Sequence, residues 1–499
     1  MKRVNPLILT AVILLSASVI SSCGETASGV PDVSDVPGSD VTETETETEE
    51  IIHYQANVPT TDFGGAAFRV AGVDPSYSPT HLLNFDEEEE TGDVVLDAIF
   101  RRNRTIEETY NIVFETKYVP SWSDCRPFLK PLVMSGDSTY QLCMLICREA
   151  FPAMLDGLCL PYSEIPYLDF SQPWYIHNVN EAFSVDGKTI LAYTDECMNA
   201  YMQTVCTFFN KNTVAEYDLE DPYQLVRNGN WTMDAFYKMT TEAIKDVDGN
   251  GDFDTNDNYG VVGESDWVYP VWVGCGLSLI EKDKDDLPVY TAPGNERMIN
   301  VLTDLADHLG RKGFFINTDR DLEGREDGIR FFTDGHVLFS VTVVGSIVSM
   351  RNMSADFGVL PLPKYDENQE QYYSRMVDGW IHIVPNTEQD VEMVGTVLEA
   401  LGAETKNYVI PAFFDIALGG KYTRDTDSEE MLDMVFNNVR IDLGDTIYYE
   451  DARLNVTNYL DTKGSDFVSM FSKFEKQINK TLQKTIDSVR DNDELLPSS

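Results

Sequence analysis

The hydrophobic pattern of the chain predicts strands that alternate with helices. An apolar run at 68–73 (FRVAGV) precedes apolar residues at helical spacing over 95–110, and 111–119 (NIVFETKYV) is rich in strand formers. This order predicts a β-α-β unit with parallel strands, and helical spacing returns over 391–401. The fold class predicted from this alternation is α/β. Further continuous apolar runs, typical of strands buried on both faces, lie at 140–147, 189–193, 204–209, 335–344 and 356–362.

Residues 1–22 have the features of an export signal. Lys2 and Arg3 form a charged start, an apolar stretch too short to span a bilayer comfortably follows, and small residues precede Cys23. The motif ISSC resembles a lipobox, which predicts that Cys23 is lipidated and that the protein is extracytoplasmic and anchored to the cell membrane. The alternative is an ordinary cleaved signal. Residues 23–60, which include TETETETEE, predict a disordered acidic linker, and 491–499 predict a polar tail.

Composition and charge narrow the possible partners. The chain of 499 residues is 42% hydrophobic and 11% aromatic, which is ample for the packed cores of two domains. A net charge of -47 repels phosphate backbones and anionic lipid, so we expect no nucleic-acid binding and membrane contact only through the anchor. Of the eight cysteines, seven remain beside Cys23, and their spacing indicates neither a disulfide framework nor a zinc site.

The stretch 246–257 (DVDGNGDFDTND) has the spacing of a twelve-residue calcium loop, with a glycine at its sixth position. A helix capped by Thr232 is predicted before the loop, and Phe253 is expected to pin the loop to the core. A strand is predicted after it at 259–263, so the ion would be a structural clip. Asp257 departs from the pattern because it replaces the usual glutamate, and the alternative is a solvated turn without metal. The predicted Ca²⁺ ligands are Asp246, Asp248, Asn250, Asp254 and Asp257, with the backbone carbonyl of Asp252.

Seven segments, spread over nearly all of the mature chain, carry a family resemblance. They begin at Thr91 (TGDVVLDAIFRRN), Leu168 (LDFSQPWY), Phe208 (FFNK), Asn228 (NGNWTMDAFYKMTTEAIKDVDGNGDFDTNDNYGVVG), Phe331 (FFTDGHVLFS), Asp356 (DFGVLPLPK) and Lys421 (KYTRDTDSEEMLDMVF). In this order they resemble the extracellular solute-binding proteins, which are the sugar-binding lipoproteins of ABC importers. The resemblance implies a two-lobed, maltose-binding-protein-like fold of the type II periplasmic-binding-protein kind, with a hinge and a cleft between the lobes. It implies a first lobe of 61–206 and 336–385, and a second of 207–335 and 386–490.

Proteins of this family close their two lobes on a solute at the hinge. A sugar has C–H faces that stack on aromatic rings and hydroxyls that need donors and acceptors. We expect Trp231 in the core because it opens a helix. The alternative for each ligand candidate is a core aromatic ring or a solvated charge. The candidates near the expected lobe edges are the aromatic residues Trp174, Tyr175, Trp267, Tyr269, Trp272 and Trp380 and the polar residues Asp195, Glu196, Arg375 and Asp378.

These features predict a substrate-binding lipoprotein of an ABC transporter. We expect a monomer without enzymatic activity that captures a mono- or oligosaccharide and delivers it to the permease subunits. The alternative is a surface-anchored glycoside hydrolase, which would need two carboxylates set across a sugar, but the sequence has no recognisable nucleophile or acid/base motif. A surface adhesin would be expected to show repeats or sandwich-like strand spacing, and the sequence has neither.

Overall fold

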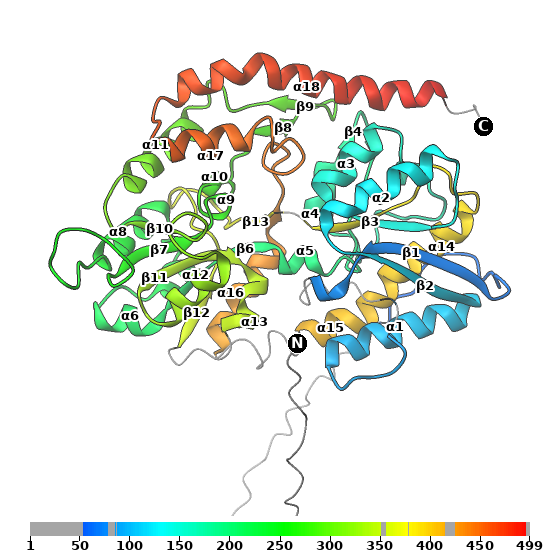
Figure 1. The fold of residues 1–499 in the computed structure, drawn as a ribbon, viewed down its shortest axis with the longest axis horizontal. Coiled ribbons are helices and arrows are strands. Elements are labelled where there is room, and N and C mark those ends of the chain that lie inside the picture. Colours follow the sequence, from blue (N-terminus) through cyan, green and yellow to red (C-terminus); the bar gives the residue numbers. More distant parts are fainter. Residues whose placement is uncertain are drawn as a thin grey trace, which may run out of the picture. The chain divides into compact units, whose positions relative to one another are not determined.

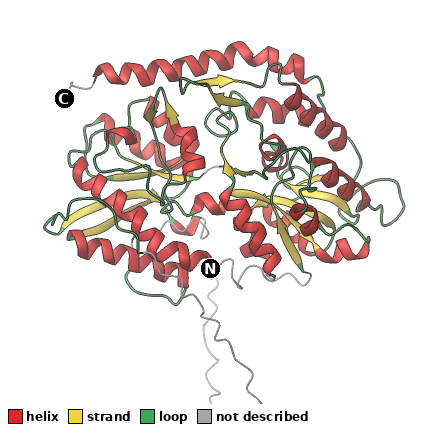
Figure 2. Cartoon of the chain, turned by 180° about the vertical axis from the view of Figure 1, so that it is seen from behind, coloured by secondary structure: helices red, strands yellow, loops and turns green. Residues whose placement is uncertain are grey.

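Two β-sheets form the framework of the protein (Figures 1 and 2). The computed structural model describes residues 53–77, 85, 87–350, 356–377, 379–414 and 425–495. In the first sheet, with the order β14-β3-β1-β2, strand β1 is parallel to β2 and β3, and β14 is antiparallel to β3. Its strands are β1 (Ala66–Val73), β2 (Ile112–Val119), β3 (Leu142–Ile146) and β14 (Trp380–Ile383).

The predicted β-α-β unit is confirmed by β1, helix α1 (Val94–Tyr110) and β2. Asp93 caps the helix, because its side chain accepts hydrogen bonds from the backbone N–H groups of Val95 and Leu96. The apolar face at helical spacing is buried, and it includes Ile99 and Ile106. The continuous run at β3 is buried at every position, as expected of a strand covered on both faces.

The second sheet has the order β10-β7-β11-β6-β13-β15, and β12 pairs with β6. Strand β7 is parallel to β10 and β11, whereas β6 is antiparallel to β11, β12 and β13. The predicted runs at 204–209, 335–344 and 356–362 are confirmed as β6, β11 and β12. The strands are β6 (Thr204–Asn210), β7 (Tyr259–Gly263), β10 (Phe315–Asn317), β11 (Val337–Val343), β12 (Phe357–Leu360), β13 (Ser374–Met376) and β15 (Val439–Arg440).

Helices cover the sheets, and two short hairpins stand apart from them (Figure 1). The hairpins are β4 (Ser184–Val185) with β5 (Lys188–Thr189), and β8 (Ile280–Lys282) with β9 (Pro288–Tyr290). The remaining α-helices are α2 (Trp122–Met134), α3 (Cys147–Leu155), α4 (His177–Asn180), α5 (Asn199–Met202), α6 (Lys211–Glu216), α7 (Pro222–Arg227), α8 (Met233–Glu242), α9 (Ser265–Val268), α10 (Val271–Gly274), α11 (Glu296–Leu309), α12 (Arg325–Thr333), α13 (Ile347–Met350), α14 (Val391–Glu404), α15 (Ile410–Phe413), α16 (Thr426–Asn437), α17 (Arg453–Asp461) and α18 (Phe467–Leu495).

The helix before the acidic loop and the strand after it are confirmed as α8 and β7. Thr232 caps α8 by accepting a hydrogen bond from the Ala235 N–H. The Phe253 ring packs edge-on against Tyr259 with centroids 5.6 Å apart, and the side chain contacts the core as expected. The core therefore fixes both ends and one interior residue of the loop.

The chain passes between the two sheets three times, after β3, after β13 and after β14. The assignment of the strands to the two sheets differs from the predicted lobe boundaries. The segment 336–385 was assigned to the first lobe, but its strands β11, β12 and β13 belong to the second sheet and only β14 joins the first. The segment shares its hydrophobicity with strands of both sheets, so pairing partners could not be assigned from it.

Three further expectations differ from the structure. The run 189–193 was predicted as a strand, but only Thr189 pairs, in the β4–β5 hairpin, and 190–193 are buried without strand structure. Residues 53–60 were assigned to the disordered linker, yet Tyr54 exchanges two backbone hydrogen bonds of 2.8 Å with the Asn407 side chain. The predicted polar tail begins inside α18, which continues to Leu495.

Seven buried cysteines with free thiols lie in the described part of the chain. None of the helices described there combines the length and apolar composition needed to cross a membrane. Cys23 and the predicted signal peptide lie outside the described residues.

Candidate functional site

A cleft of about 340 Å³ lies at the carboxyl ends of strands from both sheets. In α/β proteins, ligands bind at this edge because the loops that follow the parallel strands come together there. Residues that follow β1, β2 and β3 form one wall, and residues that follow β7 and β10 form the other. The cleft is lined by Tyr77, Trp122, Ile146, Arg148, Gln203, Glu264, Asp266, Trp267, Arg325, Val377 and Trp380.

The wall next to the first sheet presents an indole ring with a guanidinium over it. Trp122 is the first residue of α2, and Arg148 is the second residue of α3, which begins directly after β3. The guanidinium carbon of Arg148 lies 5.0 Å from the centroid of the Trp122 ring and 5.1 Å from that of Tyr449. A guanidinium is attracted by the face of an aromatic ring, so this contact restrains both side chains at the cleft.

The wall next to the second sheet repeats this arrangement. Glu264, Asp266 and Trp267 follow β7 directly, and the Arg325 guanidinium carbon lies 4.2 Å from the Trp267 ring centroid. Arg325 Nε donates a hydrogen bond of 3.0 Å to Glu264 Oε1. Burial raises the pKa of Glu264, and the charge of Arg325 opposes this shift. Asp266 Oδ1 lies 2.8 Å from Arg453 Nη1, so both carboxylates of this wall are ion-paired.

Two segments that cross between the sheets form the floor of the cleft. The Val377 N–H donates a hydrogen bond of 3.2 Å to the Gln203 carbonyl oxygen and joins the two crossing segments. Trp380 opens β14, pairs with Ile146 of β3, and donates its backbone N–H to Asn199 Oδ1 at 3.2 Å. Because the lining comes from both sheets and from their connections, any change in the placement of the sheets changes the cleft.

Three indoles, two guanidiniums and two carboxylates give the cleft a mixed chemistry. The rings provide apolar faces, and the charged groups provide hydrogen-bond donors and acceptors. The two cations of the lining balance its two anions, although the whole chain has a net charge of -47. This composition suits a neutral, polar solute with C–H surface better than a strongly cationic one.

Among the predicted aromatic ligand residues, Trp267 and Trp380 line the cleft, although only 5% and 2% of their surfaces are exposed. Trp272 is fully buried, and its Nε1 donates a hydrogen bond of 2.9 Å to Asp442 Oδ2. Tyr269 is 2% exposed, and its hydroxyl donates to a carboxylate of α17 at 2.8 Å. The structure therefore places Trp272 and Tyr269 in the core, which corrects their predicted binding role.

Trp174 and Tyr175 are core residues as well, with 1% and 4% of their surface exposed. The Tyr175 hydroxyl donates a hydrogen bond of 2.6 Å to Glu399 Oε2 in α14. Burial raises the pKa of Glu399 to about 7, although the Tyr175 hydrogen bond opposes the shift. Trp231 is fully buried and donates its Nε1–H to the Pro361 carbonyl at 2.9 Å, which confirms its expected place in the core.

Asp195 and Glu196 belong to buried ion pairs within the protein. Asp195 accepts a hydrogen bond of 2.5 Å from the Tyr201 hydroxyl, and its Oδ2 lies 2.9 Å from Lys406 Nζ. Burial raises the pKa of Asp195 despite the charge of Lys406. Glu196 Oε2 lies 3.0 Å from His382 Nε2. Both carboxylates, predicted to bind ligand hydroxyls, therefore have partners within the fold.

Arg375 is fully buried and forms a bidentate contact with Asp445. It was predicted to bind the ligand, but it contacts the cleft wall from behind, through a hydrogen bond of 2.8 Å from its Nη1 to the Asp266 carbonyl. Asp378 lies outside the described residues. Cleft residues that the sequence reasoning did not identify include Trp122, Arg148 and Arg325.

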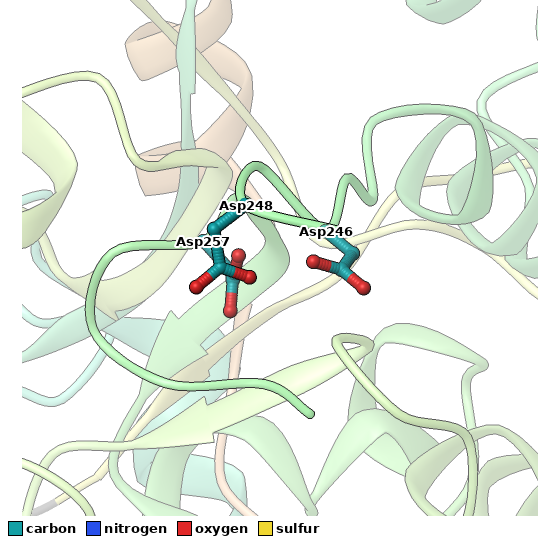
Figure 3. Close-up of side chains that lie close together, drawn as sticks. All are labelled: Asp246, Asp248 and Asp257. Atoms are coloured by element: carbon teal, nitrogen blue, oxygen red, sulfur yellow. The ribbon is translucent and has the colours of Figure 1, made fainter. Parts of the chain in front are cut away.

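The acidic loop is closed by two backbone hydrogen bonds of 3.0 Å between Lys245 and Asn258. Oxygen atoms of Asp246, Asp248 and Asp257 lie within 4.8 Å of one another, and Figure 3 shows the Asp246 carboxylate facing the other two. Asp257 is only 1% exposed. Three predicted ligand side chains therefore converge at one place.

All of the predicted ligand side chains also accept hydrogen bonds within the loop; Asp257, for example, accepts from the backbone N–H groups of Val247 and Asp254 at 2.8 and 2.9 Å. Asn250 Oδ1 accepts a hydrogen bond of 2.6 Å from the backbone of Asp252, whose carboxylate lies 3.3 Å from Lys312 Nζ. Asp254 Oδ1 accepts a hydrogen bond of 2.8 Å from the Asn256 backbone. These contacts stabilise the turn itself.

Comparison with solved structures identifies the fold. The chain is similar to an ABC substrate-binding protein from Listeria monocytogenes in complex with cycloalternan, with a TM-score of 0.55 and 13% identity over 84% of this chain and 99% of that chain. It is similar to the galacto-N-biose-/lacto-N-biose I-binding protein of the ABC transporter from Bifidobacterium longum in complex with lacto-N-biose, with a TM-score of 0.54 and 12% identity over 85% and 98% of the two chains. UgpB from Mycobacterium tuberculosis in complex with glycerophosphocholine gives a TM-score of 0.54 and 14% identity over 85% and 98%.

No protein-family model and no curated protein matches the sequence. The chain nevertheless covers nearly the whole length of each of these solved structures. The protein has the two-lobed α/β fold of ABC substrate-binding proteins, which confirms the fold predicted from its sequence.

Proposed function

We propose that the protein is the substrate-binding component of an ABC importer and that it captures a mono- or oligosaccharide between its two lobes. The observation that carries this proposal is the cleft, whose lining comes from both sheets and from the segments that cross between them. A solute that contacts both walls binds the closed arrangement more tightly than the open one. Only such a difference in affinity can drive closure.

The cleft chemistry supports a carbohydrate as the solute. Trp122 is the partly exposed indole of the lining and offers a surface on which a sugar ring could stack, while Trp267 and Trp380 reach the cleft with small parts of their rings. Arg325 and Glu264 supply donors and acceptors for hydroxyl groups at the same wall. The function requires no chemical change in the solute, so the protein would be a receptor and not an enzyme.

We propose further that Cys23 is lipidated and that the protein acts as a monomer tethered outside the cell membrane. The motif at 20–23 and the polar repeats of the linker support this, since a short anchor and a solvated tether would hold the lobes near the permease subunits. The net charge of -47 would keep the body away from anionic lipid.

The decisive experiment is calorimetric titration of the purified protein with a panel of sugars, polyols and glycerophosphocholine. We expect a sugar to bind and to be recovered intact by chromatography. Trp267→Ala should weaken binding more than tenfold, since losing an aromatic contact costs about 1.5–3 kcal/mol. Trp231→Phe is the control. It changes a tryptophan in the core beside the second sheet and should leave the affinity unchanged. Binding of glycerophosphocholine alone would refute the carbohydrate assignment, and release of shorter sugars would refute the receptor.

We also propose that Ca²⁺ binds the acidic loop as a structural clip. The residues fit the ion, because three carboxylates converge and Asp257 brings its charge into a buried position that a cation would neutralise. When bound, Ca²⁺ would supply positive charge that joins the start of the loop to its end. A ligand that binds only the folded state at one hundred times its Kd adds about 2.7 kcal/mol of stability.

Thermal melting with calcium and with a chelator tests the clip. We expect the chelator to lower the melting temperature of the wild-type protein and to have no effect on Asp257→Asn. An equal melting temperature in both buffers for the wild type would show that the loop is a solvated turn.

A further inference from the structure

A network of buried charges lies directly behind the cleft wall that contains Trp267. Its centre is Asp445, which is 2% exposed and follows β15 in the C-terminal part of the chain. Arg375 Nη2 donates a hydrogen bond of 2.8 Å to Asp445 Oδ1, and Arg375 Nε contacts the other carboxylate oxygen. Arg453 Nε lies 3.3 Å from Asp445 Oδ1. One carboxylate therefore holds two buried guanidiniums.

Both guanidiniums reach the same residue of the cleft wall. Arg375 Nη1 donates a hydrogen bond of 2.8 Å to the backbone carbonyl of Asp266, and Arg453 Nη1 lies 2.8 Å from Asp266 Oδ1. Asp266 is thus fixed at its main chain and at its side chain. The next residue is Trp267, the indole that lies under Arg325 in the cleft.

The network also reaches the floor of the cleft. Arg375 lies in β13, two residues before Val377, which lines the cleft where the chain crosses to the first sheet. The hydrogen bond from Arg375 to Asp266 therefore joins a crossing segment to the wall. Arg453, at the start of α17, adds a second connection from the C-terminal segment.

Buried charges are stable only when their partners are in place. The network contains two buried cations, Arg375 and Arg453, and one buried anion, Asp445, and it ends at the carboxylate of Asp266, whose side chain is 45% exposed. Replacing Asp445 by a neutral residue would remove the carboxylate that both guanidiniums contact, and would leave Arg453 with the partly exposed carboxylate of Asp266 and Arg375 with the Asp266 carbonyl. The guanidiniums would then have to move or recruit water, and Asp266 would lose the fixed partners that hold it.

We propose that Asp445 is a positioning residue of the cleft, which acts through Arg375 and Arg453 to hold Asp266 and, with it, the indole of Trp267. A binding site is effective when its contact groups are fixed by a second layer of buried hydrogen bonds. The role of Asp445 in ligand binding rests on the proposed function. Its role in holding Asp266 and Trp267 in place concerns the protein without ligand.

The chain contains a matched control three residues away. Asp442 is equally buried and lies on the same turn, but its carboxylate accepts hydrogen bonds from Trp272 Nε1 and from the backbone N–H groups of Leu279, Ile280 and Gly444. Asp442 thus contacts Trp272 directly, whereas Asp445 reaches Trp267 through the two arginines and Asp266. The effects of the two substitutions on these indoles can be compared within one protein.

The test is ¹⁹F NMR of the protein labelled with 5-fluorotryptophan, in which each of the six tryptophans carries one fluorine. The Trp267 and Trp272 signals are assigned with Trp267→Phe and Trp272→Phe. We expect Asp445→Asn to shift and broaden the Trp267 signal and to leave the signal of the core residue Trp231 unchanged. Asp442→Asn should move the Trp272 signal and leave that of Trp267 in place.

A milder variant guards against global unfolding. Arg453→Lys keeps the charge but loses the planar fork, so it should move the Trp267 signal in the same direction as Asp445→Asn and by less. The proposal is refuted if the Trp267 signal stays in place in both Asp445→Asn and Arg453→Lys, or if the signals of all six tryptophans shift equally. If a sugar from the binding panel is available, its Kd should rise at least fivefold in Asp445→Asn. If no sugar binds, the proposed function fails while the NMR result still decides the positioning role.

Discussion

Replacing Glu399 by glutamine should change the pH dependence of stability in a predictable way. Glu399 is 1% exposed and accepts a hydrogen bond of 2.6 Å from the Tyr175 hydroxyl. Burial raises its pKa from 4.5 to about 7 in the folded protein. Because the folded state holds the proton more tightly than the unfolded state, stability is complete below the unfolded pKa and falls as the pH rises through 7.

The size of this effect follows from the pKa difference. Each unit of pKa difference corresponds to about 1.4 kcal/mol, so ionisation of Glu399 should remove about 2–3 kcal/mol of unfolding free energy between pH 5 and pH 8. Glu399→Gln cannot ionise, and its amide oxygen can still accept the Tyr175 hydrogen bond. The substitution should therefore be roughly neutral or mildly destabilising at pH 5. Between pH 5 and pH 8, the unfolding free energy of the variant should rise by about 2 kcal/mol relative to that of the wild type.

Urea unfolding at pH 5, 6, 7 and 8, followed by circular dichroism, measures this difference. Tyr175→Phe provides the opposite perturbation, because it removes the donor that lowers the pKa of Glu399. This variant should lose more stability at pH 8 than at pH 5. Parallel pH profiles for the wild type and Glu399→Gln would refute the reasoning and would mean that Glu399 stays ionised throughout this range.

Three other predictions concern a buried hydrogen bond, a close packing contact and a helix cap. Trp272→Phe removes the donor to the buried carboxylate of Asp442 and should cost about 1.5–3 kcal/mol in urea unfolding while leaving ligand affinity unchanged. Gly402→Ala should cost about 1–3 kcal/mol in the same assay, because a Cβ there would come within 2.3 Å of the Trp174 ring; an unchanged midpoint would contradict this packing. Thr232→Ala removes the cap of α8 and should lower the unfolding free energy by about 1 kcal/mol, whereas Thr232→Ser keeps a capping hydroxyl and should retain most of this stability.

The fold was predictable where burial leaves a simple pattern. Strands β3, β6 and β11 are buried at every position, and each was recognisable as a continuous apolar run. The same pattern at 189–193 was misleading, because those residues are buried in a segment whose backbone mostly does not join a sheet. Continuous hydrophobicity reports burial, and it does not report strand pairing.

Sheet membership was not predictable for the same reason. Strands β13 and β14 are separated by three residues, yet they belong to different sheets. The crossing occurs between Met376 and Trp380, and nothing in the apolar pattern marks it. Pairing depends on partners that are distant in the sequence, such as Ile146 for Trp380.

The candidate site shows which general rule was sound and where its application failed. The rule that ligand residues follow the carboxyl ends of parallel strands was applied to 189–193 and led to Asp195 and Glu196, which form buried ion pairs. Applied to β3 and β7 it leads to Arg148 and Glu264, both of which line the cleft.

The aromatic cluster DWVYPVW shows a limit of predicting binding residues from their position in the sequence. Trp267 lines the cleft and Trp272 is fully buried, although both follow β7 within one short segment. What separates them is their partners. Arg325 lies over Trp267 at the cleft, whereas Trp272 donates to Asp442, which is 170 residues further along the chain. A side chain whose place is fixed by a distant buried charge cannot be assigned from its neighbours in the sequence, and Asp445 extends the same principle to the wall of the cleft itself.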